Sequence, residues 1–296
     1  NTFIHLRQFS NYSLLESSFK INEIINFCKK YHIPAIALTD KRNLFGSFEF
    51  SLEAKKNGIK PIIGINLDIN IIAGVRTTSN ILLLIKNLTG YRNVINLMTK
   101  FYNQSDYKIN LNDLKKYREG LICLSGRVDG PIGKSYLLKN INSATNIFNE
   151  LNLVYKDNFF LEISRIGQKN EKNIENFYLS LAKKYDVPVV ATNNNIFSDM
   201  NMHEATDALL CIKNVEKLST NTRDFVSKDF HFKSPEEMNK IFNDIPEAVS
   251  NTILIAKKCT FMLEERIAKP PKFLASDEEE NKELIKLAYE GLEKKI

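Results

Sequence analysis

The sequence predicts an α/β protein in which strands and helices alternate, either as a closed barrel or as an open doubly wound sheet. Seven apolar, strand-like runs are separated by segments whose apolar residues recur at helical spacing. Several of the runs are apolar on both faces, which is typical of strands covered by helices rather than of a half-exposed antiparallel sheet. The predicted strands are Thr2–Leu6, Ile33–Leu38, Pro61–Ile71, Ile81–Ile85, Leu121–Leu124, Phe159–Ile163 and Val187–Ala191.

Helices are predicted where apolar side chains share one face of a turn of 3.6 residues. Ile21, Ile24, Ile25 and Cys28 follow the spacing i, i+3, i+4, i+7, and similar patterns cover residues 144–151 and 174–182. A further helix over about residues 46–57 ends at Gly58, a residue that favours helix termination.

The last part of the chain has a different character. Pro246–Lys258 is predicted as a helix, Lys269–Lys272 contains two prolines that interrupt regular structure, and Asp277–Lys295 is predicted as a charged amphipathic helix. Ser276 can cap that last helix, with Glu279 three residues further on. We therefore expect one domain over residues 1–258, and a linker with the first helix of a following, truncated domain over residues 259–296.

Composition restricts the classes of function. The chain has 296 residues, of which 43% are hydrophobic and 26% charged, as in soluble globular proteins, and no apolar run is long enough to span a membrane. Its four cysteines are far apart and are interpreted as reduced thiols of a cytoplasmic protein. The net charge of +6 is distributed along the chain, which gives little support to direct nucleic-acid binding.

The ends of the predicted strands carry polar groups that do not suit metal binding. Residues 33–46 form a strand, a turn and a helix, an arrangement that displays catalytic residues in barrels, yet Asp40 in this turn is followed by Lys41 and Arg42. The other strand ends offer mainly amides, a phenyl ring and cations. Divalent metals prefer imidazole, thiolate and carboxylate ligands, and the four histidines lack paired ligand spacing. The residues therefore argue against a metal cluster.

Several segments resemble the polymerase-and-histidinol-phosphatase (PHP) domain, and specifically the PHP domain of bacterial DNA polymerase III alpha subunits. The resemblance implies a distorted TIM-like (β/α)7 barrel, with a helical C-terminal extension in this chain. In the family members that keep it, the strand ends also build a multinuclear metal site. The segments are His5–Glu16, Ala37–Gly46, Gly58–Gly64, Leu84–Asn93, Val187–Asn193 and Asp244–Thr252.

The resemblance also implies that this metal site is degenerate. Only Glu16 and Asp40 keep a carboxylate, while three of the ligand positions hold cations. A cation and a metal ion about 4 Å apart repel by about 4 kcal/mol per unit charge at an effective dielectric constant near 20, so the site should reject metal. The positions that correspond to the family's ligands are Arg7, Phe9, Glu16, Asp40, Lys41, Asn66, Asn80, Arg127, Asn194 and Ile196.

Two arrangements of the cations are possible. We hypothesise that Arg7, Lys41 and Arg127 occupy the former metal positions and pair with Asp40 and Glu16. The alternative is that the cations are simply exposed at the rim of the barrel.

Three functions are compatible with these observations. The favoured one is a catalytically inactive, cofactor-free PHP domain that is a scaffold of a replicative polymerase and, as the family implies, a docking site for its proofreading exonuclease (epsilon) subunit. The parent polymerase would bind DNA and the rest of the holoenzyme, and its Mg²⁺ would lie in a palm outside this chain. The alternatives are a metal-dependent phosphoesterase, either a proofreading nuclease or a pyrophosphatase, and a direct nucleic-acid-binding module. No membrane role is expected.

Overall fold

The structure is a computed structural model that describes residues 2–70, 78–104, 109–220, 226–265 and 272–295. The chain divides into two compact units, residues 1–263 and residues 264–296. Within the described ranges, no helix is both long and apolar enough to cross a bilayer.

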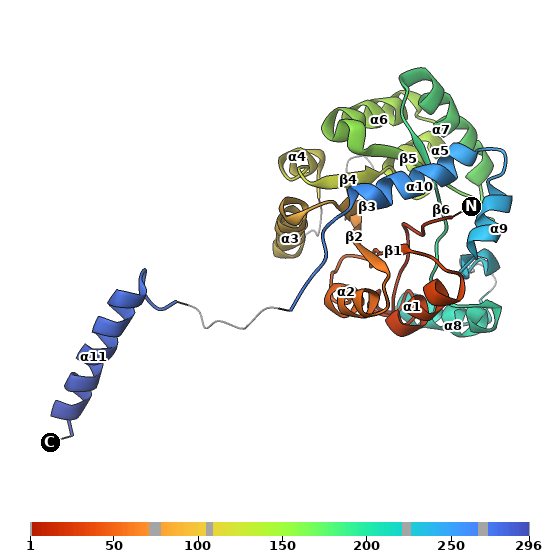
Figure 1. The fold of residues 1–296 in the computed structure, drawn as a ribbon. Coiled ribbons are helices and arrows are strands. Elements are labelled where there is room, and N and C mark those ends of the chain that lie inside the picture. The colour runs from red at the N-terminus through yellow and green to blue at the C-terminus, as the bar shows by residue number, and fades with distance from the viewer. Residues whose placement is uncertain (1, 71–77, 105–108, 221–225, 266–271, 296) are drawn as a thin grey trace. The chain divides into compact units, whose positions relative to one another are not determined.

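The first unit is built on a curled sheet of six strands in the order β1-β2-β3-β4-β5-β6, surrounded by helices (Figure 1). All six correspond to predicted strands, although the end of the predicted run Pro61–Ile71 lies outside the described residues. The strands are β1 (Ala35–Leu38), β2 (Lys60–Ile69), β3 (Ser79–Ile85), β4 (Leu121–Leu124), β5 (Phe159–Ser164) and β6 (Val189–Thr192).

One strand runs against all the others. β3 is antiparallel to both β2 and β4, whereas the remaining neighbours pair in parallel. The prediction of a regular strand–helix alternation is wrong at this step. The link over residues 70–78 is shorter than the dozen or so residues that a parallel crossover requires, so the chain can only turn back.

The segment over residues 3–9 takes the place of the predicted first strand and closes the barrel. Ala37 N and Thr39 N of the β1 side donate to the carbonyls of His5 and Gln8 at 2.9 and 2.8 Å. On the other edge, Phe9 N donates to the carbonyl of Asn195, just beyond β6, at 3.2 Å. The segment is not a regular strand, but it bridges both edges of the sheet and gives a distorted seven-membered barrel.

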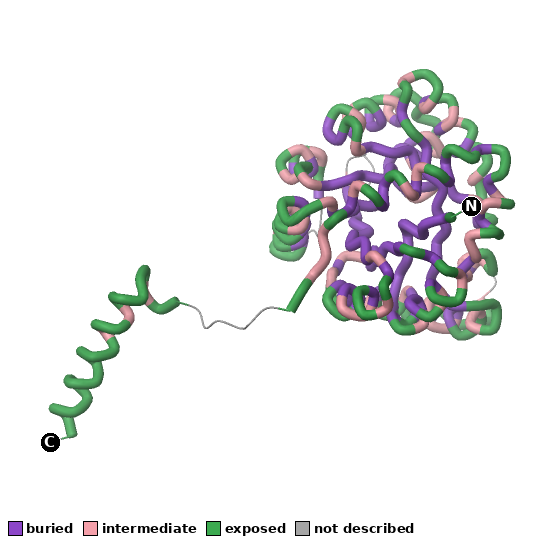
Figure 2. Tube along the Cα trace, viewed as in Figure 1, coloured by how far each residue is buried: buried purple, intermediate pink, exposed green. Residues whose placement is uncertain are grey.

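Helices cover the outside of this barrel, and the alternation of side chains explains why its strands are apolar on both faces. In β3, Ile81, Leu83 and Ile85 belong to one buried cluster, whereas Leu82 and Leu84 belong to another. The strands are buried except at Lys60 and Asn80, which are partly exposed, and the helices expose one side (Figure 2). The helices of this unit are α1 (Ile21–Lys30), α2 (Ser47–Lys56), α3 (Leu88–Asn103), α4 (Leu111–Lys116), α5 (Pro131–Leu137), α6 (Ile141–Tyr155), α7 (Glu171–Tyr185), α8 (His203–Asn214), α9 (Pro235–Ile241) and α10 (Pro246–Lys258), with short 3-10 turns η1 (Lys156–Asn158), η2 (Met200–Met202) and η3 (Lys228–Phe230).

The second unit contains the helix α11 (Asp277–Glu293), and none of its residues is buried. The predicted cap is confirmed: Ser276 Oγ accepts from Glu279 N at 3.3 Å, and Ser276 N donates to Glu279 Oε2 at 3.1 Å. The predicted break at Lys269–Lys272 lies mostly outside the described residues.

Candidate functional site at the mouth of the barrel

The topology brings the polar strand ends to one rim. The carboxyl ends of β1, β2, β4, β5 and β6 lie at the same end of the barrel, and the reversed strand β3 places its beginning there. A pocket of about 200 Å³ is found at this rim. It is lined by Phe9, Glu16, Lys41, Asn66, Asn80, Arg127, Asp129, Gln168, Asn194, Ile196, Leu210 and Phe230.

Eight of the ten positions assigned by the family resemblance line this pocket. The other two, Arg7 and Asp40, are buried, with exposed fractions of 0% and 2%. Phe9 and Ile196 contribute apolar surface and share a small buried cluster with Phe197.

Arg7 forms a buried ion pair with Glu162, a partner that was not predicted from the sequence. Its Nε and Nη2 donate to Glu162 Oε1 and Oε2 at 2.6 and 2.8 Å, and both side chains are fully buried. Burial opposes ionisation of Glu162, but the Arg7 and Arg127 guanidinium groups and the hydrogen bond from Thr192 together outweigh it and hold the pKa of Glu162 below its usual range. The predicted pairing of Arg7 with Asp40 or Glu16 is therefore wrong. An acidic residue inside the apolar run Phe159–Ile163 was the available signal for this partner.

Lys41 and Glu16 form the pair that was predicted. Lys41 Nζ lies 3.2 Å from Glu16 Oε2, and Lys213 Nζ from α8 lies 2.8 Å from Glu16 Oε1. Burial works against ionisation of Glu16, but the two ammonium groups prevail and lower its pKa. This half-exposed cluster joins α8 to the turn after β1.

Asp40 is held by serines. Its Oδ1 accepts from Ser10 N at 2.7 Å and from Ser13 Oγ at 2.6 Å, and its Oδ2 accepts from Ser10 Oγ at 2.7 Å. Among the described residues its hydrogen-bond partners are these serines rather than a cation, so the predicted ion pairing of Asp40 is wrong. Burial raises the pKa of Asp40 to about 6, although the serine hydrogen bonds oppose the shift.

Arg127 is buried in the wall of the pocket and is only loosely held. Its Nη2 lies 3.5 Å from Asp129 Oδ2 and its Nη1 lies 3.3 Å from Gln168 Oε1. In the described part of the chain its buried Nε has no hydrogen-bond partner. Burial and the nearby Arg7 guanidinium both lower the pKa of Arg127. The predicted pairing with Asp40 or Glu16 is wrong here too, and so is simple rim exposure, because Arg7 and Arg127 are buried.

Asp40 should give the barrel a distinctive pH dependence. Its pKa is raised from 3.8 to about 6, so its contribution to stability is fully present below about pH 4 and is lost as the pH rises through 6. A shift of this size corresponds to about 3 kcal/mol. We expect the unfolding free energy of wild type minus that of Asp40→Asn to fall by about this amount between pH 4 and pH 8.

Urea unfolding of both proteins across this pH range measures the difference. The matched control is Glu16→Gln, because the lowered pKa of Glu16 gives the opposite sign, with stability lost as the pH falls through its folded pKa. A wild-type minus Asp40→Asn difference that does not change with pH would contradict the assignment.

The residues at this rim do not fit a metal ion. No group of three or more histidine, cysteine or carboxylate side chains able to hold a metal occurs among the described residues. The pocket-lining positions that the family resemblance assigns to metal ligands present amides, apolar side chains, an ammonium and a guanidinium, together with the Glu16 carboxylate. The side chains of this rim fill the mouth of the barrel, and the ion pairs Arg7–Glu162 and Lys41–Glu16 balance its charges internally.

The sequence model of the PHP domain family matches residues 5–166. The DNA polymerase III subunit alpha of Rickettsia prowazekii is 39% identical over 294 residues, which is 98% of this chain and 25% of that protein. The subunit from Caulobacter vibrioides is 35% identical over 304 residues, or 99% of this chain and 27% of that protein. The chain thus spans about a quarter of the length of these relatives.

Among solved structures, a two-domain protein from Bacteroides vulgatus that contains a predicted PHP-like metal-dependent phosphoesterase superposes with a TM-score of 0.45 at 11% identity. The match covers 80% of this chain and 62% of the other.

Proposed function

Because this chain belongs to the PHP domain family, we propose that it is the PHP domain of a DNA polymerase III alpha subunit and acts there as a metal-free, non-catalytic scaffold. Residues 259–296 would then be the linker and first helix of the polymerase core that follows. Nucleotidyl transfer and the palm Mg²⁺ would belong to the rest of that cytoplasmic enzyme, together with its hold on the primer-template DNA and its contacts with the holoenzyme. The docking partner that we propose for this domain is the proofreading exonuclease, the epsilon subunit.

The observation that supports this proposal is the replacement of metal charge by protein charge. Arg7 is fully buried in its pair with Glu162, and Lys41 is held at the pocket by Glu16. A metal ion in this mouth would face the cations Lys41 and Arg127, at a cost of about 4 kcal/mol for each unit charge at about 4 Å. It would also find no imidazole or thiolate among the lining residues that the structure describes. The same observation weighs against the alternative, a metal-dependent phosphoesterase.

Metal titration tests the metal-free state. We expect Mn²⁺ and Zn²⁺ to bind without defined stoichiometry, to leave the melting temperature unchanged and to support no phosphoesterase activity. The matched variant is Glu16→Gln, which removes a carboxylate of the pocket. Stoichiometric binding that this variant abolishes, together with phosphate release by wild type, would establish the phosphoesterase instead.

Docking needs its own measurement, made on the 296-residue chain and the exonuclease subunit of the same organism. We expect the two proteins to sediment as a one-to-one complex, because a domain that catalyses no reaction can still serve the polymerase by binding its exonuclease. The chain and the exonuclease sedimenting separately at micromolar concentration would refute the docking role while leaving the metal-free scaffold intact.

A further inference from the structure

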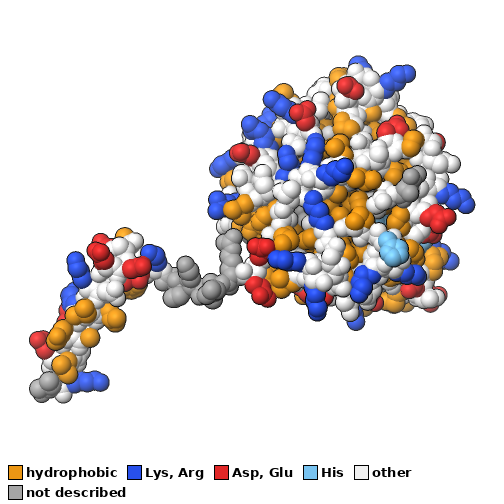
Figure 3. Space-filling view, viewed as in Figure 1, with side chains coloured by type: hydrophobic (Ala, Val, Ile, Leu, Met, Phe, Trp, Pro, Cys, Tyr) orange, Lys and Arg blue, Asp and Glu red, His pale blue; other side chains and the backbone are white. Residues whose placement is uncertain are grey.

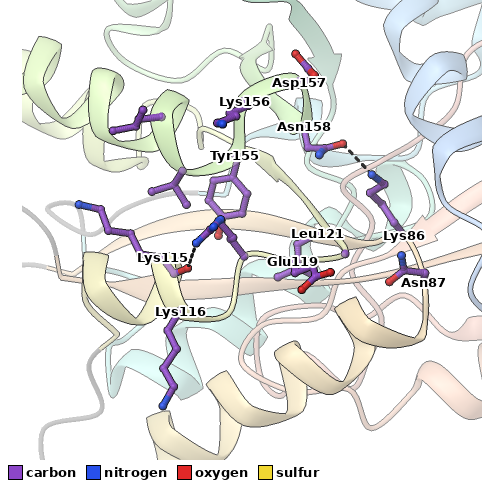
Figure 4. A pocket seen from close by; sticks show the side chains of 14 residues that line it. Lys86, Asn87, Lys115, Lys116, Glu119, Leu121, Tyr155, Lys156, Asp157 and Asn158 are labelled. Carbon is purple, nitrogen blue, oxygen red and sulfur yellow. Dashed lines mark hydrogen bonds between the residues drawn. The ribbon is translucent and has the colours of Figure 1, made fainter.

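A second and larger hollow lies at the opposite end of the barrel. It has a volume of about 950 Å³ and lies between the link from α4 to β4, the end of α6 with η1, and the residues after β3 (Figure 4). Leu121 begins β4, and η1 directly precedes β5, so this hollow is at the amino ends of strands whose carboxyl ends form the mouth. We call it the basal pocket. It is lined by Lys86, Asn87, Lys115, Lys116, Arg118, Glu119, Gly120, Leu121, Leu153, Val154, Tyr155, Lys156, Asp157 and Asn158.

The basal pocket concentrates positive charge. Its lining has five cations and two carboxylates, a net charge of +3, which is half of the chain's net charge of +6. In the space-filling view, Lys and Arg side chains gather over α4, α6 and α10 with few acidic side chains among them (Figure 3). The cations come from three separate segments: Lys115, Lys116 and Arg118 form a short basic run, and the fold brings Lys86 and Lys156 beside it.

Most of this charge is not neutralised within the described part of the chain. Lys115 pairs with Glu150 at 2.7 Å, but Glu150 does not line the pocket. Arg118 Nη1 donates to the carbonyl of Lys115 at 2.7 Å, and Lys86 Nζ donates to Asn158 Oδ1 at 3.1 Å. These acceptors are neutral, so they orient the cations without cancelling their charge.

Two further cations project from the edges of the basal pocket. Lys116 and Lys156 are both exposed, and Figure 4 shows them on different sides of the hollow. Lys156 has a φ of +49° and a ψ of −125°, a conformation that glycine adopts at low cost and lysine does not. The backbone of Lys156 is thus strained at a position where its side chain adds to the positive charge of residues 115–118.

We propose that the basal pocket binds the phosphate groups of a nucleic-acid strand. Lysine and arginine are the side chains that contact phosphate, and the cations are spread over a volume far larger than one phosphate would fill. A strand carries one negative charge per about 3.4 Å of its axis, so successive phosphates can meet cations from successive segments. Tyr155, which lines the pocket, is buried and offers no exposed ring for stacking, so binding should be independent of sequence. This inference does not depend on the role of the barrel mouth.

The test is anisotropy of a short, labelled single-stranded oligonucleotide with the 296-residue chain over a range of salt concentrations. The pocket variant is Lys116→Gln/Arg118→Gln/Lys156→Gln, in which all three wild-type side chains are exposed. The control, Lys139→Gln/Lys169→Gln/Lys183→Gln, removes the same charge from exposed positions that do not line the pocket. Thermal unfolding of both variants checks that they are folded.

We expect the pocket variant to lose about tenfold or more in affinity at low salt and the control to lose little. Each single-strand phosphate contact contributes about 0.7 to the slope of log K against log salt, so the slope should become shallower by about 2. Equal losses in the two triple variants, or no binding by wild type at low salt, would overturn the proposal.

Competitors identify the ligand chemistry. Unlabelled strand should displace the probe, whereas inorganic tripolyphosphate and polyglutamate at equal charge concentration should be much weaker. Equal displacement by tripolyphosphate would make this a free-phosphate site, and equal displacement by polyglutamate would make it a site for acidic protein. Either result would overturn the proposal.

Discussion

Replacing Arg7 by methionine should lower the free energy of unfolding by about 3–5 kcal/mol, because the substitution leaves the Glu162 carboxylate buried without its cation. The cost is large because neither side chain of this pair is exposed to water. The midpoint of urea unfolding at neutral pH measures the loss.

Two controls separate the buried charge from the loss of packing. The double variant Arg7→Met/Glu162→Met removes both charges and should recover much of the loss, since an apolar pair can replace a buried ion pair at little cost. Lys41→Met should cost only about 0–1 kcal/mol, because the Lys41–Glu16 pair is partly exposed and Lys213 also holds Glu16. A double variant as unstable as the single one would show that packing, rather than charge, gives Arg7 its importance.

Substituting Gly126 by alanine should cost about 3 kcal/mol or more, through two effects that add. The residue has a φ of +77°, where an L side chain costs about 1–2 kcal/mol. A Cβ atom there would also lie 2.3 Å from the carbonyl oxygen of Asn80 and 2.6 Å from Cα of Gly130. Both neighbours are backbone atoms at the barrel mouth, so they cannot move without shifting the chain on either side of them.

The matched control for this prediction is Gly58→Ala. Gly58 has a similar φ of +69°, but a Cβ atom there would meet no heavy atom within 4 Å. It should cost only the conformational part, about 1–2 kcal/mol. The difference in stability between the two variants, measured by thermal unfolding, therefore reports the steric cost at Gly126. Equal losses of stability would mean that the backbone at the mouth shifts to make room for the Cβ atom.

Most strands of the barrel could be predicted because a strand that is buried on both faces appears in the sequence as a short apolar run. Six of the seven predicted apolar runs are strands, and the cap at Ser276 follows from a short motif. The reversal of β3 could have been derived from the shortness of the link over residues 70–78. The irregular closure by residues 3–9 could not, because its hydrogen bonds go to residues far away in the sequence.

The positions around the mouth were predictable from the family resemblance, but their partners were not. Arg7 and Glu162 are separated by 155 positions, and only the curled sheet brings them together. Ser10 and Ser13 lie in the segment His5–Glu16 that carries the family resemblance, but the sequence does not indicate that they hold Asp40. The basal pocket could not be predicted for the same reason, since only the fold brings Lys86 and Lys156 beside the short basic run at residues 115–118.

During synthesis, the segment over residues 3–9 cannot close the barrel until a late part of the chain has been made. It can pair with β1 once residue 39 has been made, but its other edge remains open until Asn195, 187 positions after Gln8, leaves the ribosome. At about 5–20 residues per second, the interval between residue 39 and Asn195 lasts roughly 8–30 s. During that time a nascent chain presents an unpaired strand edge, a known template for wrong association. The domain therefore belongs to the proteins whose folding during synthesis ends late, and we expect chaperones that bind nascent chains to raise its yield.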